Sequence, residues 1–190
     1  LTSGGTAVSY TWDNSIVEGI AFNTSATNTY TVTGVDAIGC ENTAAVTITV
    51  FALPTVTATS DVVNNQLCNS GDVILTAGGT ATSYAWDNSV VDGVAFNTSA
   101  TNTYNVIGTD TNGCENTASI TITVNPLPTV TVTSDDADNT VCENTLVTLT
   151  GAGASSYVYT GAATDATPFT IAATETFTIT GTDTNGCVNT

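Results

Sequence analysis

Several stretches of the chain alternate between apolar and polar residues with a period of two. Residues 118–124 place Ala, Ile, Ile and Val on one face and Ser and Thr on the other. Thr55–Thr59 alternates in the same way, and Thr101–Thr109 carries Tyr104 and Val106 on one face. This is the pattern of half-buried strands. No stretch shows a convincing period of 3.6 residues, so the pattern predicts an all-β protein.

Shorter apolar runs and turn residues complete this prediction. Val73–Ala77 and Ser83–Trp86 read as further strands, and Asn112-Gly113 is a tight-turn signal. Threonine suits strands because its branched Cβ fits a pleated surface. We therefore expect small antiparallel β-sandwiches. The expected core of the central sandwich is Val56, Ile74, Tyr84, Trp86, Phe96, Tyr104, Val106, Ile120 and Ile122.

The chain repeats itself every 74 residues. Ala21–Tyr30 is identical to Ala95–Tyr104, and Trp12 aligns with Trp86. A third copy has lost one residue, so Tyr159 lies 73 residues after Trp86. The sequence therefore predicts a tandem array.

Prolines mark the junctions between copies, at Pro54, Pro126 and Pro128. Such residues favour short, stiff, extended connectors. We expect a partial repeat at 1–52 without N-terminal strands, a complete repeat at 53–125, and a partial repeat at 126–190 without its C-terminal strand. Two explanations remain open: a window on a longer array, or neighbouring chains that donate the missing strands to each other.

The charge composition excludes several classes of function. The chain has 17 acidic residues and no Lys, Arg or His, for a formal net charge of −17. Without imidazole or amine there is no Ser-His or Cys-His pair and no Schiff base. Without cations, nucleic acid is not an expected partner. No apolar run approaches 18 residues, so membrane insertion is not expected either.

The five cysteines predict disulfides and hence an oxidising, extracellular setting. No CxxC motif is present, which argues against zinc. From the repeat we expect Cys68 to pair with Cys114 and Cys142 with Cys187. Cys40 would then pair with a residue upstream of the chain. Such a bond would close a loop within one copy, and its loss would unfold that copy.

One acidic cluster suggests calcium. Asp135, Asp136 and Asp138 precede Cys142, and Asp183 precedes Cys187. Oxygen ligands at this density suit Ca²⁺. The alternative is a solvated acidic loop, since the second copy has fewer acids there and the 12-residue calcium-loop pattern is absent. No other cofactor is expected.

Three other features have weaker functional interpretations. Asp87 and Asp92 could form a general acid/base pair, but a polar turn is the plainer interpretation. Trp86 with Phe96 could stack on a sugar, although core packing is favoured. Asn23 and Asn97 begin Asn-Thr-Ser sequences that fit the N-glycosylation pattern.

The repeat resembles a known class of module. Its motifs are Tyr84-Ala-Trp86-Asp87, the run 103–106, Gly108 to Cys114, and residues 120–124 followed by a Leu-Pro connector. They are similar to the PKD-like and Ig-like tandem repeats of very large bacterial surface adhesins, of the gliding-motility and type IX secretion kind. The third copy departs from this pattern with Tyr159 in place of Trp. The resemblance implies extracellular stalks or threads and no catalytic residues.

These observations leave three functions open, none of them enzymatic. The first is a structural repeat of a large secreted cell-surface protein that acts as a rod, thread or adhesin stalk. The second is a subunit of a self-assembling filament, at the cell surface or shed from it, with lateral or strand-exchange contacts between identical chains. The third is a calcium- or carbohydrate-binding module with a surface glycan as partner. In all three, neighbouring repeats of the same chain are expected contacts.

Overall fold

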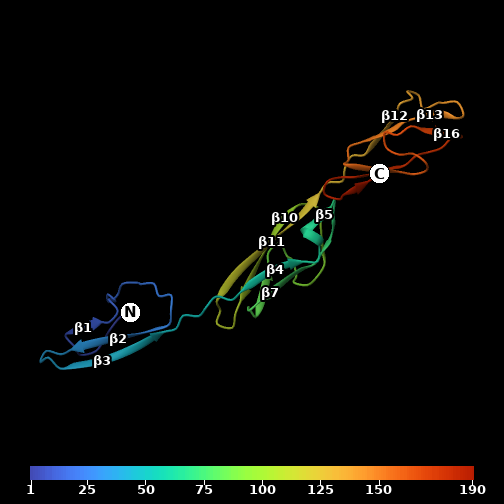
Figure 1. Ribbon diagram of the computed structural model, residues 1–190. Helices are drawn as coiled ribbons and strands as arrows, with labels where there is room; N and C mark the ends of the chain where they lie inside the picture. Colours follow the sequence, from blue (N-terminus) through green and yellow to red (C-terminus); the bar gives the residue numbers. More distant parts are fainter.

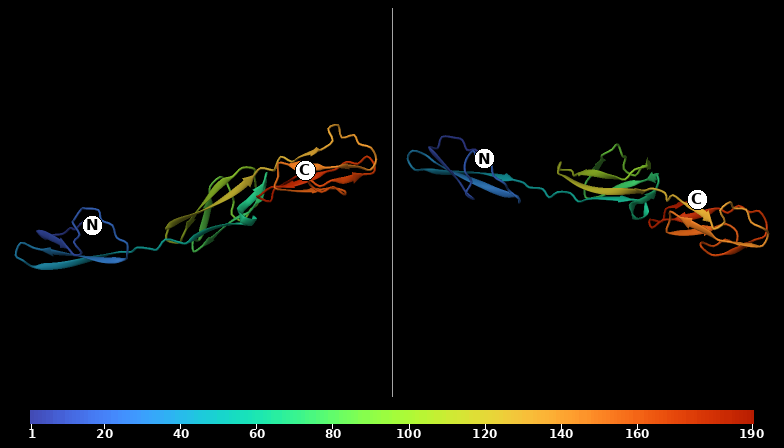
Figure 2. Two further views of the ribbon diagram at one scale, coloured as in Figure 1. Left: turned by 45° about the horizontal axis from the view of Figure 1, so that its top comes forward. Right: turned by 90° about the horizontal axis from the view of Figure 1, so that it is seen from above.

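The computed structural model describes residues 1–190 and consists of three β-rich parts strung end to end (Figure 1). We call them the first segment (1–52), the second segment (53–125) and the third segment (126–190). Two further views show the same elongated arrangement (Figure 2). The regular structure is all-β apart from one 3₁₀ turn, η1, at Val63–Asn65.

The first segment is a single antiparallel sheet in the order β1-β2-β3. Its strands are β1 (Ser9–Trp12), β2 (Asn28–Val35) and β3 (Glu41–Ile48). β3 lies at the edge of this sheet, and most of its side chains are exposed.

The second segment contains a four-stranded sheet, in the order β5-β11-β10-β8, and the strand pairs β4-β7 and β6-β9. All its pairings are antiparallel except that of β5 with β11, which is parallel and departs from the expected antiparallel pattern. The strands are β4 (Val56–Ser60), β5 (Gln66–Cys68), β6 (Gly71–Val73), β7 (Leu75–Gly79), β8 (Ser83–Trp86), β9 (Phe96–Thr98), β10 (Asn102–Thr109) and β11 (Glu115–Asn125).

The third segment forms one three-stranded sheet, β15-β17-β18, and the pairs β12-β14 and β13-β16. Its pairings are antiparallel. The strands are β12 (Thr131–Ser134), β13 (Thr145–Val147), β14 (Leu149–Ala152), β15 (Ser156–Tyr159), β16 (Phe169–Ile171), β17 (Ile179–Thr182) and β18 (Val188–Asn189).

The β10-β11 hairpin shows why the alternating sequence folds as predicted. Tyr104 lies opposite Ile120 in register, and both are buried. On the other face the hydroxyls of Thr103 and Thr121 lie 2.7 Å apart and share a hydrogen bond. Alternation therefore supplies apolar packing on one face and cross-strand hydroxyl pairs on the other.

The core of the second segment differs from the prediction at one strand. Ile74 is half-buried, and its backbone N–H donates to Asp61 Oδ1 at 2.8 Å. Because β6 ends at Val73 and β7 begins at Leu75, both neighbours of Ile74 face the core instead. Trp86 and Phe96 pack against the cluster, while Val56 and Tyr84 are half-buried. The buried cluster is Val73, Leu75, Val90, Tyr104, Ile120 and Ile122.

Candidate functional site at a disulfide-linked junction

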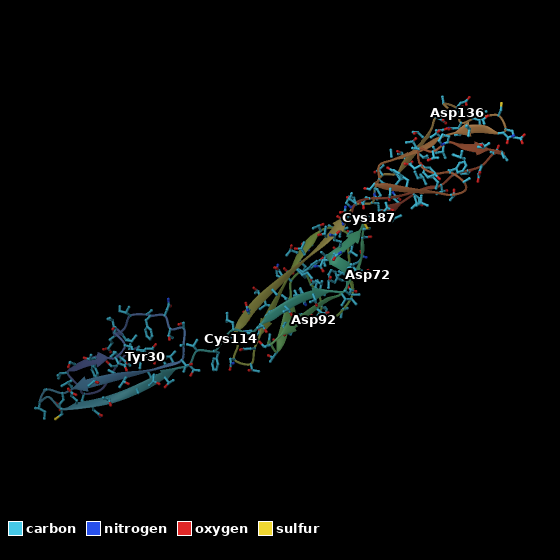
Figure 3. The ribbon with its side chains drawn as sticks, viewed as in Figure 1. Tyr30, Asp72, Asp92, Cys114, Asp136 and Cys187 are labelled. Carbon is cyan, nitrogen blue, oxygen red and sulfur yellow. A yellow bond between two sulfur atoms is a disulfide. The ribbon has the colours of Figure 1, made fainter.

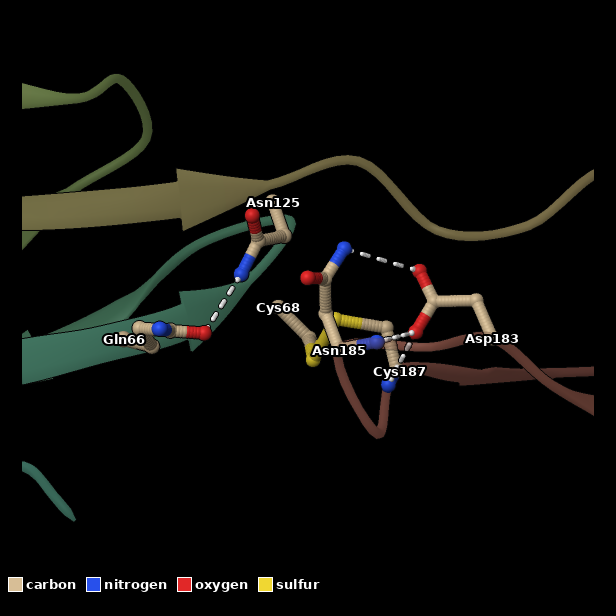
Figure 4. The surroundings of a disulfide bond; sticks show 6 residues. All are labelled: Gln66, Cys68, Asn125, Asp183, Asn185 and Cys187. Carbon is tan, nitrogen blue, oxygen red and sulfur yellow. Dashed lines mark hydrogen bonds between the residues drawn. A yellow bond between two sulfur atoms is a disulfide. The ribbon is translucent and has the colours of Figure 1, made fainter. Parts of the chain in front are cut away.

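A disulfide joins the second segment to the third. It links Cys68 at the end of β5 to Cys187 beside β18, with their Cα atoms 5.4 Å apart (Figures 3 and 4). Cys187 is fully buried. The remaining cysteines, Cys40, Cys114 and Cys142, are unpaired.

The predicted pairing of Cys68 with Cys114 is therefore wrong, and so is that of Cys142 with Cys187. The reason lies in β11, which begins directly after Cys114 and ends at Asn125, the register partner of Cys68. The two cysteines lie at opposite ends of an 11-residue strand. Such a strand spans roughly 35 Å, whereas a disulfide requires Cα atoms within about 7 Å. The observed bond restrains two neighbouring segments instead of closing a loop within one copy.

A tight turn presents Cys187 to the junction. Asp183 Oδ1 accepts hydrogen bonds from the backbone N–H groups of Asn185 and Cys187, each at 2.8 Å (Figure 4). Gly186 has φ of 82°, a conformation that a residue without Cβ adopts readily. The Asp-x-x-Gly-Cys sequence therefore orders the backbone that carries the sulfur of Cys187 to the junction.

The same turn occurs in the other two copies. Asp110 Oδ1 accepts from the backbone N–H of Cys114 at 2.9 Å, and Asp36 Oδ1 accepts from that of Cys40 at 2.9 Å. The N–H of Cys114, followed by that of Asn112, lowers the pKa of Asp110 from its ordinary value. The same turn thus places a cysteine at one end of each segment.

The opposite partner, Cys68, sits on the short parallel strand β5. Asn125 Nδ2 donates to Gln66 Oε1 at 3.2 Å (Figure 4). The carbonyl of Asn125 accepts from the N–H of Asn69 at 2.6 Å. Cys68 is thereby anchored to the end of β11, just where the chain leaves for the third segment.

Hydrogen bonds to the proline connectors reinforce both junctions. Asn189 Nδ2 donates to the carbonyl of Pro128 at 2.9 Å, and Asn116 Nδ2 donates to that of Pro54 at 2.8 Å. Both prolines are buried. Each segment therefore orders its own N-terminal connector, and at the second junction a disulfide also crosses to the neighbouring segment.

The four acids predicted to bind calcium do not come together. Asp136 lies at the outer end of the third segment (Figure 3), whereas Asp183 lies at the junction (Figure 4). Asp135 Oδ1 accepts from the N–H of Thr148 at 2.9 Å, and Asp138 Oδ1 accepts from that of Thr140 at 3.0 Å. No group of three acidic or cysteine side chains is placed to hold a metal ion. The predicted calcium site is therefore not assembled.

The carboxyl groups of the suggested acid/base pair have structural partners. Asp87 accepts from the backbone and side-chain nitrogens of Asn105, at 3.0 and 2.7 Å, and these bonds lower the pKa of Asp87. Asp92 Oδ1 accepts from Trp86 Nε1 at 2.9 Å and from the N–H of Ala77 at 2.7 Å. Asp92 thus joins an aromatic side chain to strand β7.

The counterpart of this arrangement in the third segment escaped prediction. Tyr159 replaces tryptophan, and its hydroxyl donates to Asp165 Oδ1 at 2.8 Å. Asp165 follows Tyr159 by six residues, as Asp92 follows Trp86. That shared spacing is the sequence signal that identifies the pair. Burial first, and then the hydrogen bond to Asp165, raise the pKa of Tyr159 to about 12.

The predicted glycosylation residues are exposed. Asn23 lies in a loop, and Asn97 lies in β9, where its Nδ2 donates to Asp72 Oδ1 at 2.9 Å. Attachment of a glycan at either position stays a prediction.

A groove opens at the outer end of the third segment. Its volume is about 470 Å³, and Cys142 is one of the lining residues. Also lining it are Val147, Leu149 and Phe177, whose counterparts in the second segment pack in one cluster with Ile120 and Ile122 of β11. The third segment has no strand in the position of β11 beyond the two residues of β18. The groove is thus the space that β11 fills in the second segment.

No family model matches the chain, and a comparison with curated proteins finds no match. None of the secondary structure is a helix of the length and apolar character that crossing a membrane requires. The disulfide indicates a non-reducing environment.

Proposed function

We propose that the chain is a structural repeat segment of a large secreted cell-surface protein and serves as an extracellular rod or adhesin stalk. In this proposal each copy is a small Ig-like or PKD-like β-sandwich. The observation that carries it is the disulfide between Cys68 and Cys187, which fixes consecutive segments end to end.

The buried connectors favour a rod over a chain of segments joined by flexible linkers. A linker rich in glycine would let the segments swivel. Here Pro54 and Pro128 are buried and accept hydrogen bonds from the segments that follow them. The covalent bond adds a second point of attachment at the second junction. At the second junction the disulfide and the ordered connector together oppose bending.

The charge supports a rod that stays soluble and does not aggregate. All 17 charged side chains are acidic, so neighbouring rods repel each other. At physiological salt this repulsion acts over about 8 Å. It keeps rods apart while leaving each free to extend.

The test is antibody labelling of intact cells that produce the protein, with an antibody against the second segment. We expect label on the cell exterior, distributed along threads or stalks in electron micrographs. Permeabilised cells, as a matched sample, should show label in no compartment that is unlabelled in intact cells. Label that appears only after permeabilisation would overturn the proposal.

A second candidate function is a filament in which chains exchange strands. The observation that favours it is the groove of the third segment together with the uncovered strand β3. Val46 and Ile48 of β3 occupy the repeat positions of Ile120 and Ile122, and Val46 is 38% exposed. In this candidate β3 from a second copy fills the groove, with the apolar alternation that β11 uses in the second segment.

A peptide of residues 41–50 tests strand exchange. If the groove accepts β3, the added peptide raises the melting temperature of the chain in a concentration-dependent manner. A control peptide with Val46→Asp and Ile48→Asp should have no effect, because it would bury charge in an apolar groove. Equal responses to both peptides would argue against this candidate.

A further inference from the structure

We propose that the turn of Cys40 and the surface around Cys142 are complementary halves of a disulfide junction, and that Cys142 of one copy bonds to Cys40 of another. The internal repeat carries this inference. Cys142 occupies the repeat position of Cys68, and Cys40 that of Cys187. These two positions form the observed bond between the second and third segments.

The placement of the two cysteines suits an end-to-end bond. Cys40 belongs to the hairpin turn that joins β2 to β3, and Cys142 belongs to the loop between β12 and β13. This turn and this loop lie at the outer ends of the first and third segments (Figure 1). Both are exposed. Cys114, the other unpaired cysteine, is half-buried and lies at the first junction, inside the rod (Figure 3).

The local structure of the turn half is already formed. Asp36 Oδ1 accepts from the backbone N–H groups of Ile38 and Cys40, each at 2.9 Å, as Asp183 does for the turn of Cys187. On the other side Cys142 borders the groove described above. In the second segment β11 fills that space and anchors β5, which carries Cys68. Cys142 therefore occupies the repeat position of Cys68, although residues 140–142 do not form a strand like β5.

The bond forms by thiol–disulfide exchange with a small disulfide such as oxidised glutathione. The Cys142 thiolate attacks one glutathione sulfur and releases the first glutathione thiolate. The Cys40 thiolate of the second copy then attacks the sulfur of Cys142 and releases the second. Two cysteine thiols are oxidised to one disulfide, one oxidised glutathione is reduced to two thiols, and the two protons pass to the released thiolates. The existing Cys68–Cys187 bond is unchanged.

The shared chemistry is an Asp-x-x-Gly-Cys turn on another repeat, and two sources can provide it. One is a second copy of this chain, and the other is a further repeat in the same polypeptide. The experiment separates them by peptide mapping of unreduced native material. A Cys142 peptide joined to the Gly39-Cys40 peptide indicates a second copy. A Cys142 peptide joined to a turn of different sequence indicates another repeat.

The decisive experiment uses the 190-residue chain in a glutathione redox buffer. We expect a ladder of integer multiples of the chain on a denaturing gel without reductant, which collapses to monomer on reduction. Cys142→Ser and Cys40→Ser should each abolish species larger than a dimer. Cys114→Ser is the matched control and should leave the ladder intact, because this residue lies inside the rod.

Three outcomes would overturn the inference: no ladder in the unmodified chain, a ladder that persists in Cys142→Ser, or a Cys142 that remains a thiol in native material. Peptide mapping of the unmodified chain gives the same answer if a variant does not fold. The inference builds on the end-to-end arrangement of the proposed rod, but the ladder test is independent of location. Failure of the ladder leaves the cell-labelling result untouched, and the reverse also holds.

Discussion

At the scale of single residues, the acidic side chains act as hydrogen-bond acceptors that stabilise the fold. With no cation in the chain, a carboxylate has only N–H and O–H groups as partners. Asp92, Asp165 and Asp183 each accept two hydrogen bonds through one oxygen. A chain whose charged side chains form no ion pairs can therefore still have a well-defined structure.

Replacing Asp92 with Ala should destabilise the second segment. The change removes the acceptor for Trp86 Nε1 and for the N–H of Ala77, and a lost hydrogen bond of this kind costs about 1 kcal/mol. In a domain of this size that lowers the melting temperature by roughly 4–8 °C. Calorimetry of the variant is the measurement.

Asp92→Asn is the control, because the amide retains an acceptor oxygen and should melt close to the unmodified chain. The first segment offers a natural comparison: Glu18 stands in place of Asp92, and Trp12 Nε1 is buried without a partner. Equal melting temperatures for Asp92→Ala and the unmodified chain would refute the role assigned to Asp92.

Tyr159 should make the third segment sensitive to alkali. Burial, followed by the hydrogen bond to Asp165, raises its pKa to about 12 in the folded state, above the ordinary value near 10. The folded state therefore holds this proton more tightly than the unfolded state. Its contribution to stability is complete below about pH 10 and is lost as the pH rises through 12.

Ultraviolet absorbance during an alkaline titration follows this ionisation. We expect Tyr159 to titrate about two pH units above an ordinary tyrosine, and Tyr159→Phe to remove that late component. A titration curve of the same shape in both proteins would contradict the assignment.

At the scale of elements, alternation determines which residues of a strand are buried and contribute most to stability. Ile122 of β11 is fully buried, whereas its neighbour Thr121 is exposed and bonds only to Thr103. Ile122→Ala should reduce the free energy of unfolding of the second segment by about 2–5 kcal/mol, since it removes buried methyl groups and leaves a cavity. Denaturant titration measures the loss.

Thr121→Ala is the matched control on the same strand. It should change stability by less than about 1 kcal/mol, because it removes one hydroxyl pair on an exposed face. If both variants lose similar stability, the assignment of the two faces of β11 is wrong.

The prediction of elements from sequence succeeded where the alternation is long. Ser83–Trp86 and the strands around 102–109 and 115–125 form as expected. The assignment at Ile74 failed because the chain bends between β6 and β7, so Val73 and Leu75 both turn inward. A period-2 pattern assumes one continuous strand and cannot register such a break.

At the scale of the whole molecule, the disulfide determines which part of the chain bears a pulling force. Cys68 and Cys187 are 119 residues apart in sequence. When the ends of the chain are pulled, force crosses from one segment to the next through the two sulfur atoms. The residues between the two cysteines are therefore shielded from the load.

Single-molecule stretching of the chain should reveal this shielding. In the reduced chain we expect about 400 Å more extension than in the oxidised chain, at roughly 3.5 Å for each released residue. Cys187→Ser should behave as the reduced chain under both conditions. Cys114→Ser, the control, should retain the difference.

The same length in the oxidised and reduced chains would show that the bond does not carry the load. An extension that is shorter in the reduced chain than in the oxidised chain would contradict the proposed shielding more directly. Either result would also weaken the proposed rod, because its rigidity is attributed to the junction.

The amino-acid sequence by itself determined the β class, most strand positions, the three copies and the proline junctions. These follow from local rules: alternation, turn residues and repeat spacing act over a few residues or are visible as identities. The exposed polar faces of Thr and the apolar faces around Tyr104 and Ile120 also follow from alternation alone.

Only the tertiary structure decided which cysteines bond. A repeat spacing is satisfied equally by pairs within copies and by pairs between successive copies, so the sequence could not choose between them. The choice depends on β11, whose length separates Cys68 from Cys114 and whose end places Cys68 against the next segment. Likewise, only the structure shows that Asp136 and Asp183 lie at opposite ends of one segment. Distance along a folded strand is a three-dimensional property, and it determined both outcomes.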